Sequence, residues 1–180
     1  MSDESPLWIR YKNGDIDALG VIFRHYFRDI YHYGMKIMSE SDVVKDVIQE
    51  MFVKLWDKRH SVGKVNNVKS YLLVMLRREL IHYAKSTSYE YSVNNEEFSL
   101  STEDIIIESE ENEAMKHMLH NEIQKLTARQ REIIFLRFYT NLNYNDIAFV
   151  LEMNVQSVRN LLFRSLENIR KELRKEQSER

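Results

Sequence analysis

A group of hydrogen-bonding and cationic side chains near the C-terminus is the part of the sequence best suited to contacts with another molecule. On a helical wheel these side chains lie roughly 100–200° from the apolar residues of the same segment. They are Gln156, Ser157, Asn160, Arg164 and Lys171, with Arg159 beside them and nearer the body of the domain. Amides pair with base edges and cations contact phosphates. This face therefore has the chemistry of a helix that binds in the major groove of DNA.

The apolar spacing around this face predicts two helices joined by a short turn. Residues Ile147, Ala148 and Leu151 recur at helical spacing, and the polar stretch 152–154 interrupts them. The second apolar series consists of Val155, Val158, Leu162, Leu166, Ile169 and Leu173. Such a pair is typical of a helix-turn-helix motif. The alternative is two packed helices whose outer face is only solvated.

Two further helices are expected before this motif. One lies within residues 105–125, and the next begins after Thr127, which forms a capping box with Gln130. In the first half of the chain, an amphipathic helix is expected from Ile16 to Met38 with Asp15 as its cap. A second helix follows from a cap at Ser41 or Asp42 and runs to about Lys58.

The helix that ends near Lys58 has two different faces. Its apolar face is formed by Val44, Val47, Ile48, Met51 and Leu55, and the opposite face carries Asp46, Gln49 and Glu50. Phe52 and Trp56 border the polar face. Aromatic side chains beside charges are typical of a docking surface for another protein. The alternative is a solvated face whose aromatic side chains fold into the core.

The next loop and helix are basic. Residues 58–85 contain seven Lys or Arg and one acidic residue. The candidates for contact with nucleic acid are Lys64, Asn66, Asn67, Tyr71, Arg77, Arg78 and His82. Cations beside aromatic rings suit single-stranded nucleic acid, because the charges contact phosphates and the rings stack on unpaired bases. A basic helix that is merely solvated is the alternative.

Composition and charge indicate an all-α protein of two small helical domains. The 180 residues include four Gly and one Pro, and residues 90–113 hold nine acidic residues and no Lys or Arg. We expect domains at 1–88 and 113–180, joined by an acidic flexible linker at 89–112. The chain lacks Cys, a signal segment and a long apolar run, so we expect a soluble, intracellular protein.

No motif for catalysis or cofactor binding is found in the sequence. It has no P-loop, no G-x-G-x-x-G, no G-x-S-x-G and no H-E-x-x-H. We expect neither enzymatic activity nor a metal, a cofactor or a small-molecule substrate.

Two separate stretches resemble one protein family. The segment D-V-I-Q-E-M-F-V-K-L-W at 46–56 and the segments at 126–138 and 144–164 are similar to regions two and four of bacterial sigma factors of the extracytoplasmic-function class. The resemblance implies a transcription initiation factor that binds core RNA polymerase. Region two would dock Asp46, Gln49 and Glu50 on the β′ clamp helices.

The same resemblance implies how the DNA is recognised. The loop and helix around K-S-Y-L-L-V-M-L-R-R-E-L-I-H-Y at 69–83 would read and open the −10 element. Region four would read the −35 element and contact the β flap. The implied partners are core polymerase, promoter DNA and an anti-sigma factor, which in this family can be membrane-anchored. The implied location is the cytoplasm.

One residue in the helix-turn-helix differs from the family pattern. Glu152 stands where many members have Gly. A Glu at positive φ costs about 1 kcal/mol or more, so we expect Asn154 to take that conformation and shift the turn.

The rival interpretations are a free-standing helix-turn-helix regulator with an N-terminal sensing or dimerisation domain, and a protein–protein adaptor. The regulator leaves the two-faced helix and the basic segment without a role, and the adaptor explains neither basic region.

Overall fold

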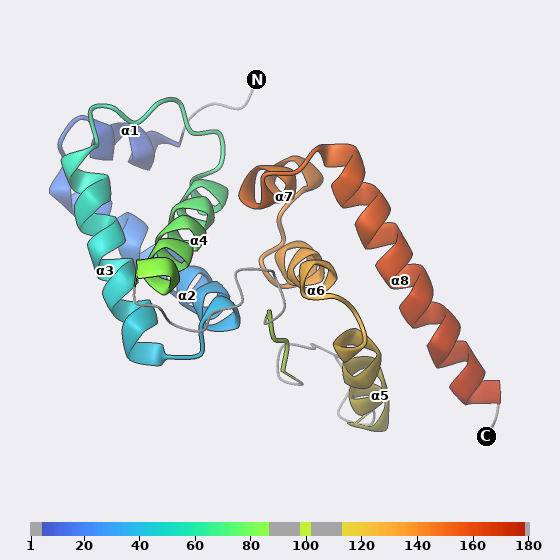
Figure 1. Ribbon diagram of the computed structural model, residues 1–180. Coiled ribbons are helices and arrows are strands. Elements are labelled where there is room, and N and C mark those ends of the chain that lie inside the picture. Colours follow the sequence, from blue (N-terminus) through green and yellow to red (C-terminus); the bar gives the residue numbers. More distant parts are fainter. Residues whose placement is uncertain (1–4, 87–97, 102–112, 179–180) are drawn as a thin grey trace. The chain divides into compact units, whose positions relative to one another are not determined.

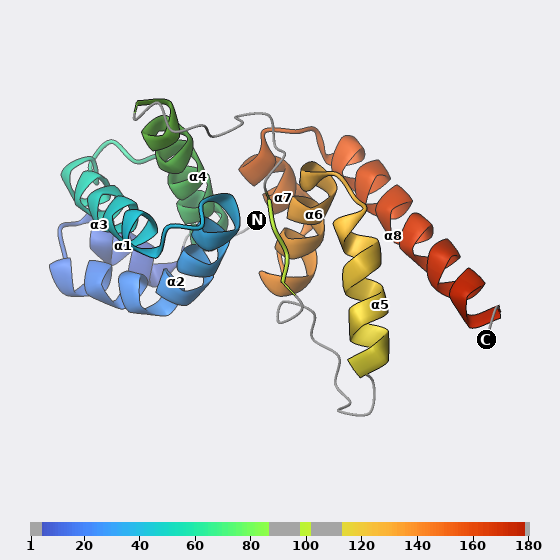
Figure 2. The ribbon, with the colours of Figure 1, turned by 60° about the horizontal axis from the view of Figure 1, so that its bottom comes forward.

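The computed structural model describes residues 5–86, 98–101 and 113–178, and all of its regular elements in these ranges are helices. The chain divides into two compact units, Met1–Tyr91 and Ser92–Arg180. Both units are drawn in Figure 1 and, turned by 60°, in Figure 2. Most of the expected linker 89–112 lies outside the described residues, as does the part of the expected helix that precedes Glu113.

Within residues 5–86, unit 1 consists of four helices packed around an aromatic and aliphatic core. They are α1 (Pro6–Lys12), α2 (Ile16–Ile37), α3 (Ser41–Asp57) and α4 (Val68–Ser86). Helices α2, α3 and α4 contact one another in every pairing, and α1 packs on α2. The apolar face expected for α3 is buried throughout, with Val44, Ile48 and Met51 fully inaccessible.

The ends of these helices follow local hydrogen-bond chemistry. Asp15 caps α2 as expected, because its carboxylate accepts from the backbone N–H of Ala18 at 3.0 Å. The cap of α3 differs from the expectation: Glu40 occupies that position and makes no side-chain capping bond, and Ser41 is already helical. Helix α4 begins before Ser70, because Asn67 accepts from the Ser70 N–H at 3.2 Å.

Unit 2 consists of α5 (Glu113–Gln124), α6 (Ala128–Ile134), α7 (Tyr144–Leu151) and α8 (Val155–Ser178). The last turn of α6 widens into the π-helix η3 (Phe135–Tyr139). Helix α8 contacts α5, α6 and α7, and it is the longest element of the unit (Figure 1). The capping box at the start of α6 is confirmed, with both reciprocal bonds between Thr127 and Gln130 present.

A short described part of the expected linker packs on unit 2. Phe98 and Leu100 are buried, whereas Ser99 between them is exposed. The Phe98 ring meets Phe135 edge-on, with 5.6 Å between centroids. Arg131 donates to the carbonyl of Phe98 at 2.6 Å and also to that of Leu126. Residues 98–100 therefore differ from the flexible linker expected here, because the alternating apolar side chains of Phe98 and Leu100 give this segment a buried face.

The turn of the helix-turn-helix does not follow the sequence expectation. Glu152 itself adopts the left-handed conformation, with φ 53° and ψ 43°. The N–H of Met153 returns to the carbonyl of Ala148 at 2.9 Å, which is a common way to close a helix at such a residue. Asn154 instead caps α8 by accepting from the Ser157 N–H at 2.7 Å. The expected shift of the turn to Asn154 was wrong, because Asn154 has this capping role.

A side chain from α6 contributes to the same turn. Arg129 donates to the carbonyl of Leu151 at 2.5 Å and pairs with the buried carboxylate of Glu132 at 3.0 Å. The carbonyls in the last turn of a helix have no partner within the helix. The Arg129 bond therefore stabilises the end of α7 directly before the strained residue.

Close packing at one glycine generates a first prediction. A Cβ on Gly34 of α2 would lie 2.6 Å from Cγ1 of Val44 and 3.3 Å from Cδ2 of Leu76. We expect Gly34→Ala to lower the free energy of unfolding of unit 1 by about 1–3 kcal/mol, because overpacking outweighs the better helix propensity of Ala. Both Trp residues of the chain lie in unit 1, so denaturant unfolding followed by Trp fluorescence reports this unit.

Gly20 in the same helix is the matched control. A Cβ there would meet only the end of the flexible Arg24 side chain at 3.5 Å. Gly20→Ala should leave stability unchanged or raise it by up to about 1 kcal/mol. Equal destabilisation by both substitutions would show that the α2–α3 contact at Gly34 is not tight.

The turn generates a second prediction. Glu152→Gly should raise the free energy of unfolding of unit 2 by about 0.5–1 kcal/mol, because glycine adopts the left-handed conformation without steric cost. Asn154→Ala should lower it by about 1 kcal/mol through loss of the cap. The measurement is denaturant unfolding followed by far-UV circular dichroism. The two substitutions should change the free energy of unfolding in opposite directions. Stabilisation by Asn154→Ala would contradict the observed turn.

Candidate functional site

The polar stripe of α3 is fully accessible in the folded unit. Asp46, Gln49 and Glu50 are all exposed, and Val53 on the same face is 61% exposed. The opposite face of the helix is buried. An exposed apolar side chain within a polar stripe is common in protein interfaces. The stripe can therefore accept a protein partner without disturbing the core.

The two aromatic residues expected at the border of this stripe behave differently. Phe52 is only 7% exposed and packs edge-on against Phe23, with 5.0 Å between ring centroids. It is a core residue, so its expected role as a surface contact was wrong for the folded unit. Trp56 is half-buried, and the guanidinium of Arg59 lies 4.3 Å from its ring centroid. Part of the Trp56 ring remains available.

The basic loop and helix present four of their expected contact residues fully. Lys64, Asn66, Arg78 and His82 are exposed, whereas Arg77 is half-buried. The single acidic residue of this segment, Glu79, pairs with Lys54 of α3 at 2.6 Å. The hydrogen bond to Glu79 is the main reason that the pKa of Lys54 is raised. The acid is thus engaged with α3 and leaves this segment predominantly cationic.

Two residues of this segment are already engaged inside the unit. The side chain of Asn67 caps α4 through the Ser70 N–H, and its backbone carbonyl accepts from the Ser70 hydroxyl at 3.0 Å. Tyr71 is half-buried, and its ring meets Trp8 edge-on with 5.6 Å between centroids. Burial raises the pKa of the Tyr71 hydroxyl, which therefore stays protonated at neutral pH. Asn67 acts first as a helix cap, and Tyr71 has only part of its ring free.

The outer face of α8 matches the sequence expectation closely. Gln156, Asn160, Arg164 and Lys171 are exposed, and Ser157 is half-buried next to the Asn154 cap. The Gln156 amide donates to Oδ1 of Asn160 at 2.8 Å. These two amides lie one turn apart at the N-terminal end of the helix, where a recognition helix meets base edges.

Arg159 lies beside this face and contacts the preceding helix. Its guanidinium is 5.4 Å from the ring centroid of Tyr144, the first residue of α7. Arg137 of η3 lies 5.3 Å from the same ring and donates to the carbonyl of Leu142 at 2.9 Å. Cation–π contacts at exposed sites contribute about 0.5–1 kcal/mol. Tyr144 therefore orients two cations at the edge of the α8 face.

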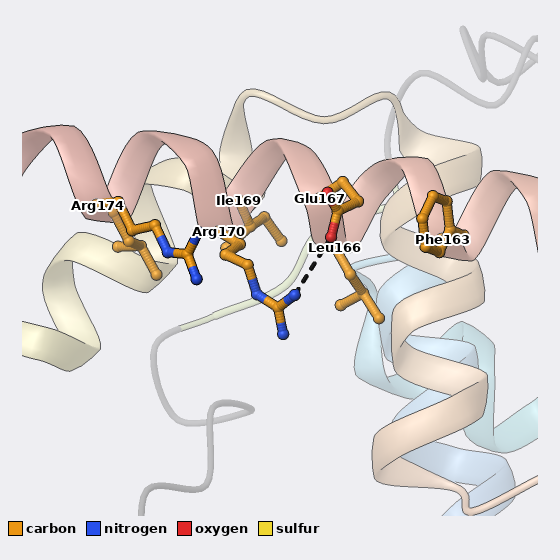
Figure 3. A pocket seen from close by; sticks show the side chains of 7 residues that line it. Phe163, Leu166, Glu167, Ile169, Arg170 and Arg174 are labelled. Carbon is orange, nitrogen blue, oxygen red and sulfur yellow. Dashed lines mark hydrogen bonds and ion pairs between the residues drawn. The ribbon is translucent and has the colours of Figure 1, made fainter.

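Two apolar residues of α8 lie differently from the sequence expectation. Leu166, expected in the core, is 39% exposed, and the buried position on its turn is occupied by Ser165, whose hydroxyl donates to the carbonyl of Leu161. Phe163 is 67% exposed and was not among the expected contact residues. Figure 3 shows both side chains along a groove on α8 with Ile169 and the Glu167–Arg170 ion pair.

No helix in the described ranges is both long and apolar enough to cross a membrane.

Comparison with known proteins identifies the family. The family model for Sigma-70 region 2 matches residues 22–89, and that for Sigma-70, region 4 matches residues 116–169. The chain is 20% identical to the ECF RNA polymerase sigma factor SigM of Bacillus subtilis, over 83% of this chain and 91% of that protein. It is 26% identical to the RNA polymerase sigma-H factor of Pseudomonas aeruginosa, over 91% and 90% of the two chains.

Solved structures share the fold. The structure of CnrH in complex with the cytosolic domain of CnrY matches with a TM-score of 0.59 and 15% identity, covering 93% of this chain and 94% of that one. The sigma factor RpoE of Bartonella quintana, in complex with the anti-sigma factor NepR, matches with a TM-score of 0.56 and 20% identity, covering 91% and 98%.

The two regional matches lie in the expected order and together span more than half of the chain. Residues 22–89 include α3 and α4, and residues 116–169 include α7 and the N-terminal part of α8. The protein belongs to the sigma-70 family, in its extracytoplasmic-function class, and is a transcription initiation factor that works with RNA polymerase at promoter DNA.

Proposed function

We propose a division of this role between the two units at the level of single residues. Residues 1–88 bind core polymerase and read and open the −10 element, residues 113–180 read the −35 element, and residues 89–112 connect them. The observation that carries the proposal is the two-faced helix α3, whose polar stripe is exposed while its opposite face is buried. The rival interpretation, a free-standing helix-turn-helix regulator, assigns no role to this stripe.

On α3, the docking residues are Asp46, Gln49 and Glu50, with Trp56 at the border. Phe52 supports this helix from the core side and is not part of the surface. Removal of one charged partner in a docked interface costs about 2–5 kcal/mol, whereas a charge at the rim costs far less. The stripe would thus supply a substantial part of the affinity for the β′ clamp helices.

In the −10 reader, Lys64, Asn66, Arg78 and His82 are the primary contacts. Asn66 hydrogen-bonds an exposed base edge, the cations hold phosphates, and the accessible part of Tyr71 stacks on a base. Arg77 assists from a half-buried position. Opening the duplex requires favourable sites for unstacked bases and no chemical step, so the protein has no enzymatic role in this proposal.

In the −35 reader, Gln156 and Asn160 contact base edges, with Ser157 beside them. Arg159, Arg164 and Lys171 contact the phosphate backbone. Phe163 joins this set, because an exposed phenyl ring one turn after Asn160 can contact a thymine methyl group. Two weak DNA sites become one strong site when polymerase fixes their spacing, since the second contact then forms at high effective concentration.

Regulation and location follow from the same role. RpoE of Bartonella quintana was solved in complex with an anti-sigma factor, and an anti-sigma factor is the regulatory partner we assign to this chain. The cytoplasm, where polymerase transcribes, is the corresponding location.

The docking stripe is tested by the double variant Gln49→Ala with Glu50→Ala. We expect core polymerase binding to weaken at least about tenfold, which corresponds to about 1.4 kcal/mol. The thermal transition should be nearly unchanged, because both side chains are exposed. Affinity is measured by titration of the full chain with core polymerase, and function by transcription from a matched promoter.

Asp17→Ala is the control for the docking experiment, since it removes an exposed acid from the first turn of α2. This variant should bind core polymerase normally. A double variant that melts at a much lower temperature would show that the stripe is structural, and the docking assignment would be wrong.

The −35 helix is tested by comparing amide and cation variants. Asn160→Ala or Gln156→Ala should relax the preference at one or two base pairs, because a good base contact discriminates by about 1–3 kcal/mol. Lys171→Ala or Arg164→Ala should weaken binding to all sequences alike and reduce the salt slope by about one. The measurements are transcription from a promoter library and salt titration of binding.

The two classes of variant serve as controls for each other, because both lie on one helix. If Arg164→Ala changed the sequence preference while both amide variants kept it, the face assigned to the bases would be rotated about the axis of α8.

A further inference from the structure

Helix α1 is short, lies outside the region-two match at 22–89, and yet contributes two fully buried aromatic residues. Trp8 and Tyr11 are both 0% exposed, and their rings lie 4.8 Å apart. Helices of two turns are marginal by themselves, so α1 is stabilised by what its aromatic side chains contact. Besides packing on α2, α1 reaches through these side chains the two helices that carry the proposed polymerase and −10 contacts.

Tyr11 connects α1 to the end of α3. Its hydroxyl donates to the backbone carbonyl of Leu55 at 2.5 Å, in a buried position. Leu55 is in the last turn of α3, where carbonyls lack a partner within the helix. Burial raises the pKa of the Tyr11 hydroxyl far above its ordinary value. The group therefore remains a hydrogen-bond donor at any pH at which the protein works.

Trp8 connects α1 to the start of α4. Its ring meets the Tyr71 ring edge-on, with 5.6 Å between centroids and an interplanar angle of 72°. Tyr71 lies in the first turn of α4, four residues after Asn67. The Nε1 of Trp8 is buried and has no hydrogen-bond partner within the described residues. The contact is therefore ring packing, which a phenyl group can also provide.

The segment between these two contacts is the proposed −10 reading loop. It leaves α3 after Asp57 and enters α4 at Val68. Arg59 at its start packs on Trp56, and Gly63 in its middle has open space around it. The loop residues Lys64 and Asn66 are exposed, whereas Val65 between them is buried. The two ends of the loop, together with the buried Val65, thus determine where these side chains lie.

We infer that Trp8 and Tyr11 are positioning residues for promoter opening, because they fix the end of α3 relative to the start of α4 and thereby the loop between them. The inference rests on the proposed roles of the α3 stripe and of the 58–67 loop. Neither aromatic residue contacts DNA in this arrangement. They act through the placement of Asn66 and Tyr71 against the unpaired strand.

The test uses the full chain with core polymerase and a promoter that carries a fluorescent base analogue in the −10 element. Three quantities are measured: affinity for core polymerase, affinity of the closed complex, and the rate constant of opening. Tyr11→Phe and Trp8→Ala should slow opening about tenfold, an increase of about 1.4 kcal/mol in the barrier. Core and closed-complex affinities should stay within about twofold of the wild-type values, a difference below 0.5 kcal/mol.

Two further variants separate positioning from general stability. Trp8→Phe retains an aromatic ring against Tyr71 and should open the promoter at nearly the wild-type rate. Ile9→Ala changes an exposed residue of the same helix, which is 44% accessible, and should behave like wild type in all three measurements. If Trp8→Ala impairs folding, Tyr11→Phe, which removes a single oxygen, decides the test.

The outcomes are distinct from failure of the proposed function. If the wild-type protein neither bound polymerase nor opened the promoter, the proposed function itself would fail. If the wild type opened it and Tyr11→Phe opened it equally fast, the positioning inference alone would be overturned. A uniform loss in all three quantities, in parallel with a lower thermal transition, would also overturn it, because α1 would then only support the fold.

Discussion

In both units, a side chain from an earlier helix donates a hydrogen bond to a carbonyl in the last turn of a later one. Arg129 donates to Leu151 at the end of α7, and Tyr11 donates to Leu55 at the end of α3. Carbonyls at helix ends are unsatisfied within the helix, so one well-placed donor fixes where the chain leaves. The exit from α7 sets the direction of α8, and the exit from α3 sets the start of the loop before α4. The surfaces assigned to DNA in each unit therefore depend on contacts that are remote from the DNA.

Long helices with a regular apolar period could be predicted from the sequence, and so could the caps that have a strong chemical signature. Asp15 and the Thr127–Gln130 box are of this kind, because a side-chain acceptor three residues before a free N–H is a local feature. Helix α1 was missed, since seven residues are too few to show a period. Pro6 at its first position was the available signal. The left-handed residue was misassigned because the competing role of Asn154 as a cap depends on the helix that follows.

A candidate contact residue could be predicted where its role follows from its residue type. It could not be predicted where its role depends on whether its side chain is exposed. The stripe of Asp46, Gln49 and Glu50 and the amides of α8 were identified because charged and amide groups are rarely buried without partners. Aromatic residues carry no such rule. Phe52 lies in the core and Phe163 lies on the surface, although both border polar positions on their helices. Leu166 shows the same difficulty for an aliphatic residue. The apolar stripe of α8 on the helical wheel is broader than the strip of this helix that the rest of the unit covers.

In the proposed −35 reader, the hydrogen bond between Gln156 and Asn160 would compete with any bond from either amide to a base edge. In the free protein each side-chain amide uses part of its hydrogen-bonding capacity on the other. A base edge must therefore offer better hydrogen-bond geometry than the neighbouring amide before the Gln156–Asn160 bond breaks. Net gains from exchanging one hydrogen bond for another are about 1 kcal/mol, which makes this exchange sensitive to small errors in fit. A mismatched base pair would leave the amides bonded to each other and the helix held by its cations alone. During search along DNA only the cations would contact it, and at a promoter the two amides would contact it as well. The Gln156–Asn160 bond would have to break for this change.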